Sequence, residues 1–148
     1  MNTTILGAGS FGTAMAVHLT SLGHNVKMWT IDAEQAEIMN REHRNNFCFF
    51  DTALPDKIAA TIDLREALDF SDRYIMAIPT QFEREVCGKI AALSPAPGHM
   101  LNLAKGIEIS TGSLLHKVHE ELCPNMVYSA LSGPSHAEEV LIDCPTTV

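Results

Sequence analysis

A glycine-rich turn directly after the first apolar segment constrains this chain more than any other feature. Residues 2–6 read Asn-Thr-Thr-Ile-Leu, which is typical of a short strand, and residues 7–12 read Gly-Ala-Gly-Ser-Phe-Gly. The Ala-rich stretch that follows predicts a helix that ends near Gly23. A G-x-G-x-x-G turn between a strand and a helix is the fingerprint of a βαβ unit that binds a dinucleotide.

Each glycine of this turn has its own physical role in such a site. Gly7 permits the tight turn out of the strand, Gly9 lets the backbone approach a pyrophosphate, and Gly12 lets the helix pack closely on the sheet. The N-terminus of the helix then offers free N–H groups and a partial positive charge to the phosphates. The competing interpretation is a glycine-rich turn that binds no ligand.

A second strand is predicted over residues 25–29, and an acidic residue follows it. Asp32 stands at about the spacing at which a carboxylate meets the adenosine ribose of a dinucleotide. Asp32 with Gln35 three residues later is also typical of a helix N-terminus, where Asp32 would be the cap. Both roles remain open from the sequence.

Composition limits the class of protein. The 148 residues are one domain's length, 46% of them are hydrophobic, and the net charge is −8 without a basic run. A nucleic-acid partner is therefore not expected. The sequence has no apolar stretch long enough to span a membrane, and the first strand begins almost at Met1, so we expect no signal peptide and a cytoplasmic protein.

Cysteine and histidine spacing gives no metal-binding pattern. The four cysteines are scattered without a C-x-x-C pair, so we expect free thiols, several of them buried. His116 and His119 are one helical turn apart, and we interpret them as part of a solvated helix face. The cysteines are Cys48, Cys87, Cys123 and Cys144.

Strand and helix patterns alternate through the rest of the chain. Further strands are predicted over 58–62, 74–78, 100–104 and 126–131, and helices over 32–41, 63–70, 81–93, 113–122 and 135–142. Residues 42–56 are interpreted as a partly ordered excursion held down by its phenylalanines, and residues 145–148 as the opening of another β-rich run. The pattern predicts a doubly wound α/β domain over residues 1–148, a Rossmann-type fold with a mainly parallel sheet.

Two further motifs follow predicted strands, where ligands bind in such sheets. Lys105 is a cation directly after a buried strand, where it would hold a phosphate or polarise a carbonyl unless it is an ordinary surface lysine. Ser135 with Glu138 predicts a capped helix, so the N–H groups after Gly133 would form a second anion site or simply an ordinary cap.

Four stretches, in this order along the whole chain, resemble NAD(P)-dependent glycerol-3-phosphate dehydrogenase. They are residues 7–12, 77–82, 104–112 and 132–139. The resemblance implies hydride transfer between a nicotinamide cofactor, NAD or NADP, and the dihydroxyacetone phosphate/sn-glycerol 3-phosphate pair. In bacteria this reaction supplies the backbone of phospholipids.

The resemblance also implies roles for individual residues. Lys105 would contact both cofactor and substrate and would polarise the substrate, while Gly133 and Ser135 would bind the substrate. The remaining cofactor contacts would come from Gly7, Gly9, Ser10, Phe11, Gly12, Ile31, Asp32, Phe82 and Ala137.

The chain departs from the resemblance at the end of the second strand. Similar bacterial proteins often carry Arg or His where this chain has Ile31, a cation suited to a 2′-phosphate. NAD is therefore slightly favoured over NADP, unless Lys27 or Arg41 supplies the missing cation.

The second departure is the length of the chain. Family members continue into a helical domain, which supplies the acid–base lysine, so the resemblance places that lysine beyond Val148. Because the second domain is absent from these residues, we interpret the chain as an excised domain or the product of a truncated gene and expect no turnover from it alone. A homodimer stays open for the full-length protein.

Two alternatives stay open from the sequence. One is another Rossmann-fold reductase, of the hydroxyacid or ketopantoate type. The other is a free-standing nucleotide-binding regulatory module without catalysis.

Overall fold

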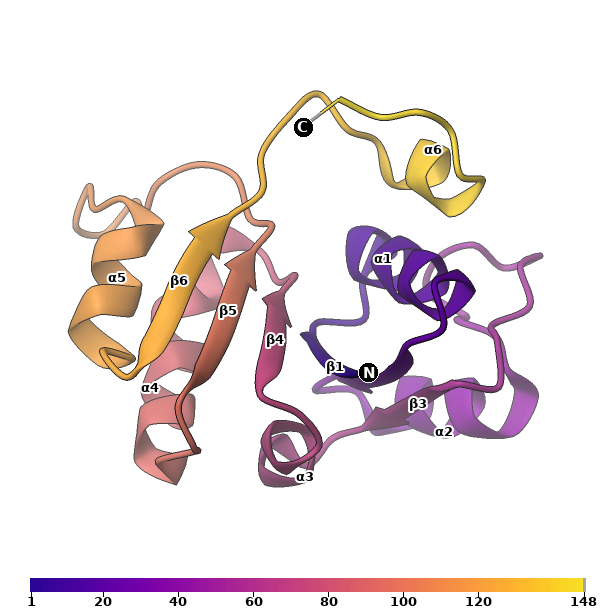
Figure 1. Ribbon diagram of the computed structural model, residues 1–148, viewed down its shortest axis with the longest axis horizontal. Coiled ribbons are helices and arrows are strands. Elements are labelled where there is room, and N and C mark those ends of the chain that lie inside the picture. Colours follow the sequence, from indigo (N-terminus) through magenta and orange to yellow (C-terminus); the bar gives the residue numbers. More distant parts are fainter. Residues whose placement is uncertain (148) are drawn as a thin grey trace.

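The computed structural model describes residues 1–147 as a parallel sheet of six strands with helices on both faces (Figure 1). The strands are β1 (Asn2–Leu6), β2 (Asn25–Trp29), β3 (Ile58–Thr61), β4 (Arg73–Met76), β5 (Gly98–Asn102) and β6 (Met126–Ala130). The helices are α1 (Ser10–Ser21), α2 (Ala33–Glu42), α3 (Leu64–Asp69), the 3-10 turn η1 (Thr80–Phe82), α4 (Glu83–Leu93), α5 (Leu115–Leu122) and α6 (Ala137–Leu141).

The strand order is β3-β2-β1-β4-β5-β6, and every neighbouring pair is parallel. The chain runs outward from β1 to β3, then crosses back to β4 and continues in the opposite direction. This confirms the doubly wound α/β prediction. The order reverses between β1 and β4, so the carboxyl ends of these two strands form the crevice where such sheets bind ligands.

The central strand β1 is buried on both faces, as the parallel sheet requires. Ile5 belongs to a core cluster that also contains residues of α1 and α2, whereas Leu6 belongs to a second cluster with residues of α3 and α4. Because successive strand side chains point to opposite faces, one apolar strand joins both cores. This packing holds the glycine turn at the centre of the fold.

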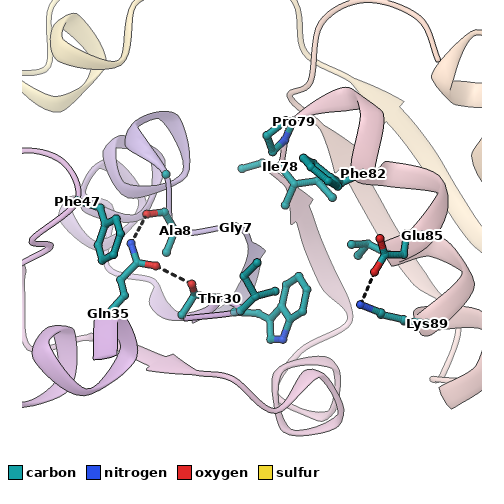
Figure 2. A pocket seen from close by; sticks show the side chains of 15 residues that line it. Gly7, Ala8, Thr30, Gln35, Phe47, Ile78, Pro79, Phe82, Glu85 and Lys89 are labelled. Carbon is teal, nitrogen blue, oxygen red and sulfur yellow. Dashed lines mark hydrogen bonds and ion pairs between the residues drawn. The ribbon is translucent and has the colours of Figure 1, made fainter. Parts of the chain in front are cut away.

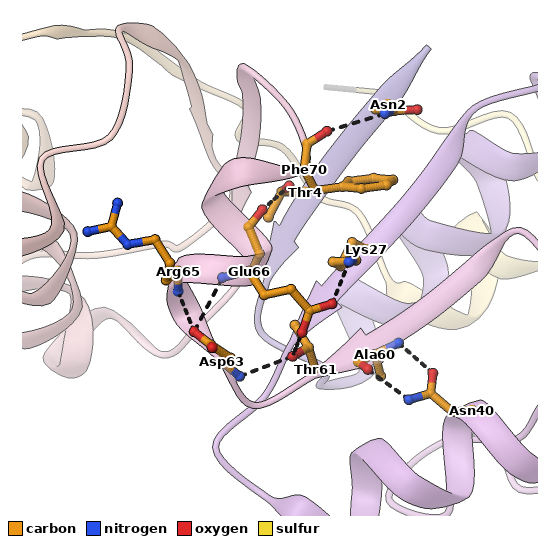
Figure 3. Close-up of polar contacts among 11 residues, drawn as sticks. Asn2, Thr4, Lys27, Asn40, Ala60, Thr61, Asp63, Arg65, Glu66 and Phe70 are labelled. Atoms are coloured by element: carbon orange, nitrogen blue, oxygen red, sulfur yellow. Dashed lines mark hydrogen bonds and ion pairs between the residues drawn. The ribbon is translucent and has the colours of Figure 1, made fainter.

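Asp32 and Asp63 are the N-caps of α2 and α3, at the starts of the two predicted helices, but in neither helix does the side chain three residues later bond back to the cap residue. The Asp63 carboxylate accepts hydrogen bonds from the backbone N–H groups of Arg65 and Glu66 (Figure 3). The Glu66 carboxylate accepts instead from Lys27 Nζ at 2.6 Å and from the Thr61 hydroxyl at 2.5 Å. The Glu66 side chain therefore ties α3 to β2 and β3 of the sheet and does not bond back to the helix start.

The segment between α2 and β3 is held in place differently from the prediction. Phe47 and Phe50 are 56% and 65% exposed and Phe49 is only half-buried, so the phenylalanines are not its main anchor. Asn45 has no exposed surface, and Cys48 and Leu54 are buried. The anchor is therefore a polar side chain with buried hydrogen bonds, which apolar patterning does not reveal.

The prediction of a solvated histidine face on α5 is wrong for His119. This residue is 2% exposed, because it lies on the helix face that Leu115 and Val118 turn toward the sheet. Its ring lies 4.8 Å from the Tyr128 ring, and its Nε2 lies 3.3 Å from the Glu83 carboxylate. The buried carboxylate gives the imidazole a polar partner that the sequence spacing did not reveal.

The last residues of the chain do not bear out the predicted β-rich run as far as they are described. Residues 145–147 form no strand, and Val148 lies outside the described residues. The acid–base lysine that the resemblance places beyond Val148 also lies outside them. It therefore stays a prediction.

Residues 1–147 contain neither a membrane-spanning helix nor a metal cluster. None of the helices there has the length and apolar character needed to cross a bilayer. Across the same residues, no three His, Cys, Asp or Glu side chains come together as metal ligands. All four cysteines are free thiols, and Cys144 is the exposed one.

Candidate dinucleotide-binding site

A cleft of about 490 Å³ lies at the crevice between the carboxyl ends of β1 and β4 (Figure 2). One wall comes from the glycine turn and the end of β2, and the other from the turn after β4 and the start of α4. The lining residues are Gly7, Ala8, Gly9, Trp29, Thr30, Ile31, Gln35, Phe47, Ala77, Ile78, Pro79, Phe82, Glu85, Val86 and Lys89.

The glycines of the turn are required for two different reasons. Gly7 has a φ of +119°, and a Cβ there would lie 2.4 Å from the Ala77 carbonyl oxygen. A Cβ on Gly12 would lie 2.3 Å from the Gly7 carbonyl oxygen. These two positions therefore need glycine for the turn and the helix packing to form at all.

Gly9 differs because a Cβ there would meet nothing within 4 Å. Its φ of −78° is open to any residue, so the folded chain itself does not demand glycine at this position. Gly9 is also the N-cap of α1, and no side chain of the described chain caps that helix. An uncapped helix N-terminus beside an open glycine fits a bound pyrophosphate.

Within residues 1–147, the end of β2 offers no free cation to the cleft. Ile31 is 83% exposed and lines the cleft, whereas the Asp32 carboxylate accepts from the Gln35 backbone N–H at 3.0 Å as the N-cap of α2. Lys27 pairs with Glu66 at 2.6 Å, and Arg41 pairs with two carboxylates of its own helix. Neither residue lines the cleft, so the suggestion that one of them replaces the cation is not supported.

A lysine does line the cleft, on the opposite wall. Lys89 Nζ lies 2.7 Å from the Glu85 carboxylate, one helical turn earlier on α4 (Figure 2). The pair is neutral overall and about half exposed. It therefore adds little net positive charge to the cleft.

Lys105 contacts three other parts of the chain: the segment before α6, the start of α1 and the turn after β4. Its Nζ donates to the Gly133 carbonyl oxygen at 2.7 Å and lies 6.0 Å from the centre of the Phe11 ring. The Thr80 hydroxyl donates to the Lys105 carbonyl at 2.7 Å, which fixes the backbone of this loop. The structure thus brings together Lys105, Gly133 and Phe11, all of which were predicted as site residues.

The helix predicted over residues 135–142 is present as α6, with its N-cap one residue later than Ser135. The helix α6 begins at Ala137, its N-cap is His136, and no side chain of the described chain caps it. The bond from Lys105 to Gly133 holds the chain before α6 against the β5 loop, so residues 133–135 do not form a helix turn. Because α6 has only 5 residues, its N-terminus alone does not support the second anion site that the sequence leaves open.

Ser135 nevertheless has a feature that fits ligand binding. It is 9% exposed, and within residues 1–147 its buried hydroxyl has no hydrogen-bond partner. An orphaned buried hydroxyl costs free energy unless a ligand or water satisfies it. It lies two residues after Gly133, the residue that Lys105 contacts.

A buried polar group supports the loop that carries Lys105. The Asn102 side chain accepts from the Ala104 backbone N–H and donates to the Glu83 carboxylate, each at 2.7 Å. This amide ends β5 two residues earlier than the sequence pattern predicts. It also ties the backbone next to Lys105 to the first turn of α4.

The next part of the same loop is held by a charge network. Arg84 donates to both oxygens of Glu108, at 2.7 and 3.0 Å, and to Glu121 at 2.9 Å. The Thr111 hydroxyl donates to the same Glu108 carboxylate. The Arg84 guanidinium first, and Thr111 second, hold the pKa of Glu108 below its usual range.

This pKa shift makes stability depend on pH in a defined direction. A depressed carboxyl pKa contributes stability above the ordinary value of about 4.3, and that contribution is lost as the pH falls toward the folded-state pKa. We expect the wild type to lose more free energy of unfolding between neutral pH and pH ~3.5 than Glu108→Gln, whose side chain does not titrate. Urea denaturation across this range measures the difference.

Glu120→Gln is the matched control for this prediction. Glu120 also pairs with a lysine and has a lowered pKa, but its pair is exposed on the surface of α5. Solvent screens such pairs, so its effect on the pH profile is expected to be smaller. Parallel profiles for the wild type and Glu108→Gln would contradict the stated role of Glu108.

The predicted residues form two neighbouring groups rather than one pocket. Gly7, Gly9, Ile31 and Phe82 line the cleft. The group around Lys105 and Gly133 lies on the other side of the turn, where Ala137 is buried at the start of α6.

Two residues of the cleft, Trp29 and Phe47, are not expected there from the sequence. Trp29 is the last residue of β2, and its position at a strand end is the available signal for it. Phe47 lies in the segment between α2 and β3, where no local pattern marks a ligand-binding position.

Comparison with known proteins shows which family the chain resembles. The sequence model described as NAD-dependent glycerol-3-phosphate dehydrogenase N-terminus matches residues 2–148. The chain belongs to this family. The match is to the family that the four motifs resemble.

Individual family members are similar along the whole chain. A curated glycerol-3-phosphate dehydrogenase [NAD(P)+] of Staphylococcus haemolyticus is 41% identical over 148 residues, which are 98% of this chain and 45% of that protein. One from Thermoanaerobacter sp. is 41% identical over 147 residues, 99% of this chain and 44% of that protein. The chain therefore spans less than half the length of the curated relatives it matches.

Solved structures agree with the family assignment. The crystal structure of glycerol-3-phosphate dehydrogenase from Coxiella burnetii has a TM-score of 0.90 at 30% identity, covering 98% of this chain and 44% of that one. The Plasmodium falciparum enzyme has a TM-score of 0.85 at 25% identity, covering 97% and 43%. In the family's longer members, over half of the chain has no counterpart in these 148 residues.

Proposed function

We propose that this chain is the NAD(P)-binding part of a glycerol-3-phosphate dehydrogenase. The observation that carries the proposal is the cleft at the β1–β4 switch point, with an open Gly9 and an uncapped α1 N-terminus on one wall. Family membership supports the choice of a nicotinamide dinucleotide over other ligands. We assign residues 1–148 to this domain.

Assigned roles follow the two groups of residues. The glycine turn and the first residues of α1 hold the pyrophosphate; these residues are Gly7, Gly9, Ser10, Phe11 and Gly12. The end of β2, at Ile31 and Asp32, receives the adenosine ribose, and Phe82 and Ala137 lie against the cofactor.

The substrate role falls to the group around Lys105. Its ammonium already lies against the Gly133 carbonyl, and the unpartnered hydroxyl of Ser135 is two residues away along the chain. A cation and a hydroxyl at this point suit a phosphorylated three-carbon ketone. Lys105 polarises the carbonyl, and Gly133 and Ser135 orient the substrate.

The proposed reaction is the reduction of a ketone, which needs one hydride and one proton. When bound, the reduced nicotinamide supplies a hydride to the carbonyl carbon of dihydroxyacetone phosphate. The carbonyl oxygen takes a proton and becomes the hydroxyl of sn-glycerol 3-phosphate. We assign that proton to a lysine in the part of longer family members that lies beyond Val148.

We expect this chain to bind NADH at least as tightly as NADPH. Ile31 offers no charge to a 2′-phosphate, and the lysine that lines the cleft is already paired with Glu85. A missing charge-assisted hydrogen bond costs about 1.5–3 kcal/mol. Dissociation constants for both cofactors, measured by calorimetry, test this. Clearly tighter NADPH would show that this interpretation of the β2 end is wrong, and Ile31→Arg is expected to shift preference toward NADPH.

A substrate panel on a full-length protein that carries this chain tests the proposed reaction. We expect NADH oxidation with dihydroxyacetone phosphate and none with simple hydroxyacid precursors such as pyruvate or ketopantoate. Oxidation with the latter alone would replace the proposal by a hydroxyacid-type reductase. Cofactor binding without turnover of any substrate would favour the regulatory module.

The proposal includes a cytoplasmic location and a homodimer of the full-length protein. Cell fractionation would test the location, and size-exclusion chromatography would test the dimer. Recovery of the full-length protein in the membrane fraction, or elution as a monomer, would contradict the respective part.

A further inference from the structure

Asn45 is a fully buried polar side chain outside the residues that the motifs point to. Its Nδ2 donates to the Ala8 carbonyl oxygen and to the Thr13 hydroxyl, both at 2.9 Å. Its Oδ1 accepts from Gln35 Nε2 and from the Phe47 backbone N–H, both at 3.0 Å. An asparagine amide has two donors and two acceptor positions, and here all four are used.

Gln35 joins Asn45 on the same backbone atom. Its Nε2 donates to the Ala8 carbonyl at 2.9 Å, and its Oε1 accepts from the Thr30 hydroxyl at 2.6 Å (Figure 2). The Ala8 carbonyl, inside the glycine turn, thus receives two hydrogen bonds from buried side-chain amides. The donors come from α2 and from the segment between α2 and β3.

This arrangement determines which way the next N–H group faces. The Ala8–Gly9 peptide is planar and trans, so its C=O and N–H point in opposite directions. With the Ala8 oxygen turned inward to Asn45 and Gln35, the Gly9 N–H is turned outward, on the side of the cleft that Gly9 lines. A flipped peptide would leave buried amide donors unpaired, which is costly.

We propose that Asn45, with Gln35, is a positioning residue of the dinucleotide site. The two side chains hold the Ala8–Gly9 peptide in the one orientation that offers the Gly9 N–H to a phosphate oxygen. The segment between α2 and β3 is thereby part of the binding site, although Asn45 itself lies behind the turn. The inference rests on the proposed function, because it explains how the turn binds a pyrophosphate.

The competing explanation is that Asn45 merely anchors its own segment. Both explanations predict lower stability when the side chain is lost, so stability alone does not separate them. A positioning role predicts a specific loss of affinity for NADH in protein that is still folded. It also predicts that the Gly9 amide of the wild type responds directly to NADH.

The test compares Asn45→Leu with Asn40→Leu, which are both uncharged replacements of similar size. Asn40 is a matched control because its amide also makes two backbone hydrogen bonds, with the N–H and C=O of Ala60 at 2.8 Å, between α2 and β3 (Figure 3). These bonds lie away from the glycine turn. NADH affinity is measured by calorimetry at a temperature where each melting curve shows only folded protein.

We expect Asn45→Leu to weaken NADH binding by about tenfold or more, the loss of one hydrogen bond to a charged group. Asn40→Leu should bind within about twofold of the wild type, because no hydrogen bond to the ligand or to the turn is lost there. Equal affinity in Asn45→Leu and the wild type, or equal losses in the two variants, would overturn the inference. No NADH binding by the wild type would instead remove the proposed function.

Two further measurements keep the inference testable if Asn45→Leu fails to fold. Gln35→Met removes the other donor to the Ala8 carbonyl without adding charge and is expected to weaken NADH binding severalfold. In the folded wild type, the Gly9 amide resonance should shift on addition of NADH, while that of Gly23, at the far end of α1, should not. Wild-type affinity in Gln35→Met together with an unmoved Gly9 amide would overturn the inference.

Discussion

Gly9→Val is expected to abolish NADH binding while leaving the fold intact. A Cβ at Gly9 would meet nothing within 4 Å, so the apo chain tolerates the branched side chain. The valine methyl groups would then occupy the open space beside the α1 N-terminus, where the pyrophosphate must approach the backbone. Loss of two hydrogen bonds to a charged group, at about 1.5–3 kcal/mol each, predicts at least about a hundredfold weaker binding.

Gly88→Val is the control for this variant. Gly88 also has open space around its Cβ position, and it lies in α4 but does not itself line the cleft. Calorimetry with NADH and melting curves are measured for both variants. Binding by Gly9→Val at the wild-type level, in folded protein, would show that the pyrophosphate does not lie at this turn.

We also expect the 148-residue chain to bind NADH but not to turn over substrate. Reduction of a ketone needs a proton donor in hydrogen-bond reach of the carbonyl oxygen, and losing general acid catalysis costs about 10²–10⁴-fold. The proton donors that this chain brings to the Gly133 segment are Lys105, already hydrogen-bonded to the Gly133 carbonyl, and His136. The family resemblance gives Lys105 a polarising role and assigns proton transfer to a lysine beyond Val148.

Loss of substrate orientation adds to this deficit. Without the second domain of longer family members over the substrate, water reaches the charge contacts to the substrate phosphate and weakens them. A steady-state assay with NADH and dihydroxyacetone phosphate measures the outcome, with a full-length protein carrying this chain as the positive control. Substantial turnover by the 148 residues, abolished in Lys105→Ala or His136→Ala, would mean that the acid is already present here.

Local patterns predicted the fold because each βα unit is marked within a few residues. The glycine turn, the strand that follows α1 and the caps at Asp32 and Asp63 all stand where the sequence places them. Their signals are short-range: an apolar run, a special φ at Gly7, or a carboxylate before a helix. The parallel order of the sheet then follows from the alternation of strands and helices.

The failures concern side chains whose partners are distant in the sequence. Asn45 meets Ala8 across 37 positions, and His119 meets Glu83 across 36, so no local pattern pairs them. The start of α6 differs by one residue from the capping pattern, which places the N-cap at Ser135 rather than at His136. The hydrogen bond from Lys105 to Gly133, which joins residues 28 positions apart, fixes the chain just before this helix. Tertiary contacts decided all three cases.

The most direct test of the central claim is energy transfer from Trp29 to NADH in the wild-type chain. Trp29 is the single tryptophan and lines the cleft, so the signal reports on this site alone. Titration with NADH, with excitation of the tryptophan, should quench its emission and raise the nicotinamide emission, and both should saturate at one NADH per chain. Unchanged tryptophan emission at saturating NADH, in folded protein, would contradict the assignment of the cleft as the dinucleotide site.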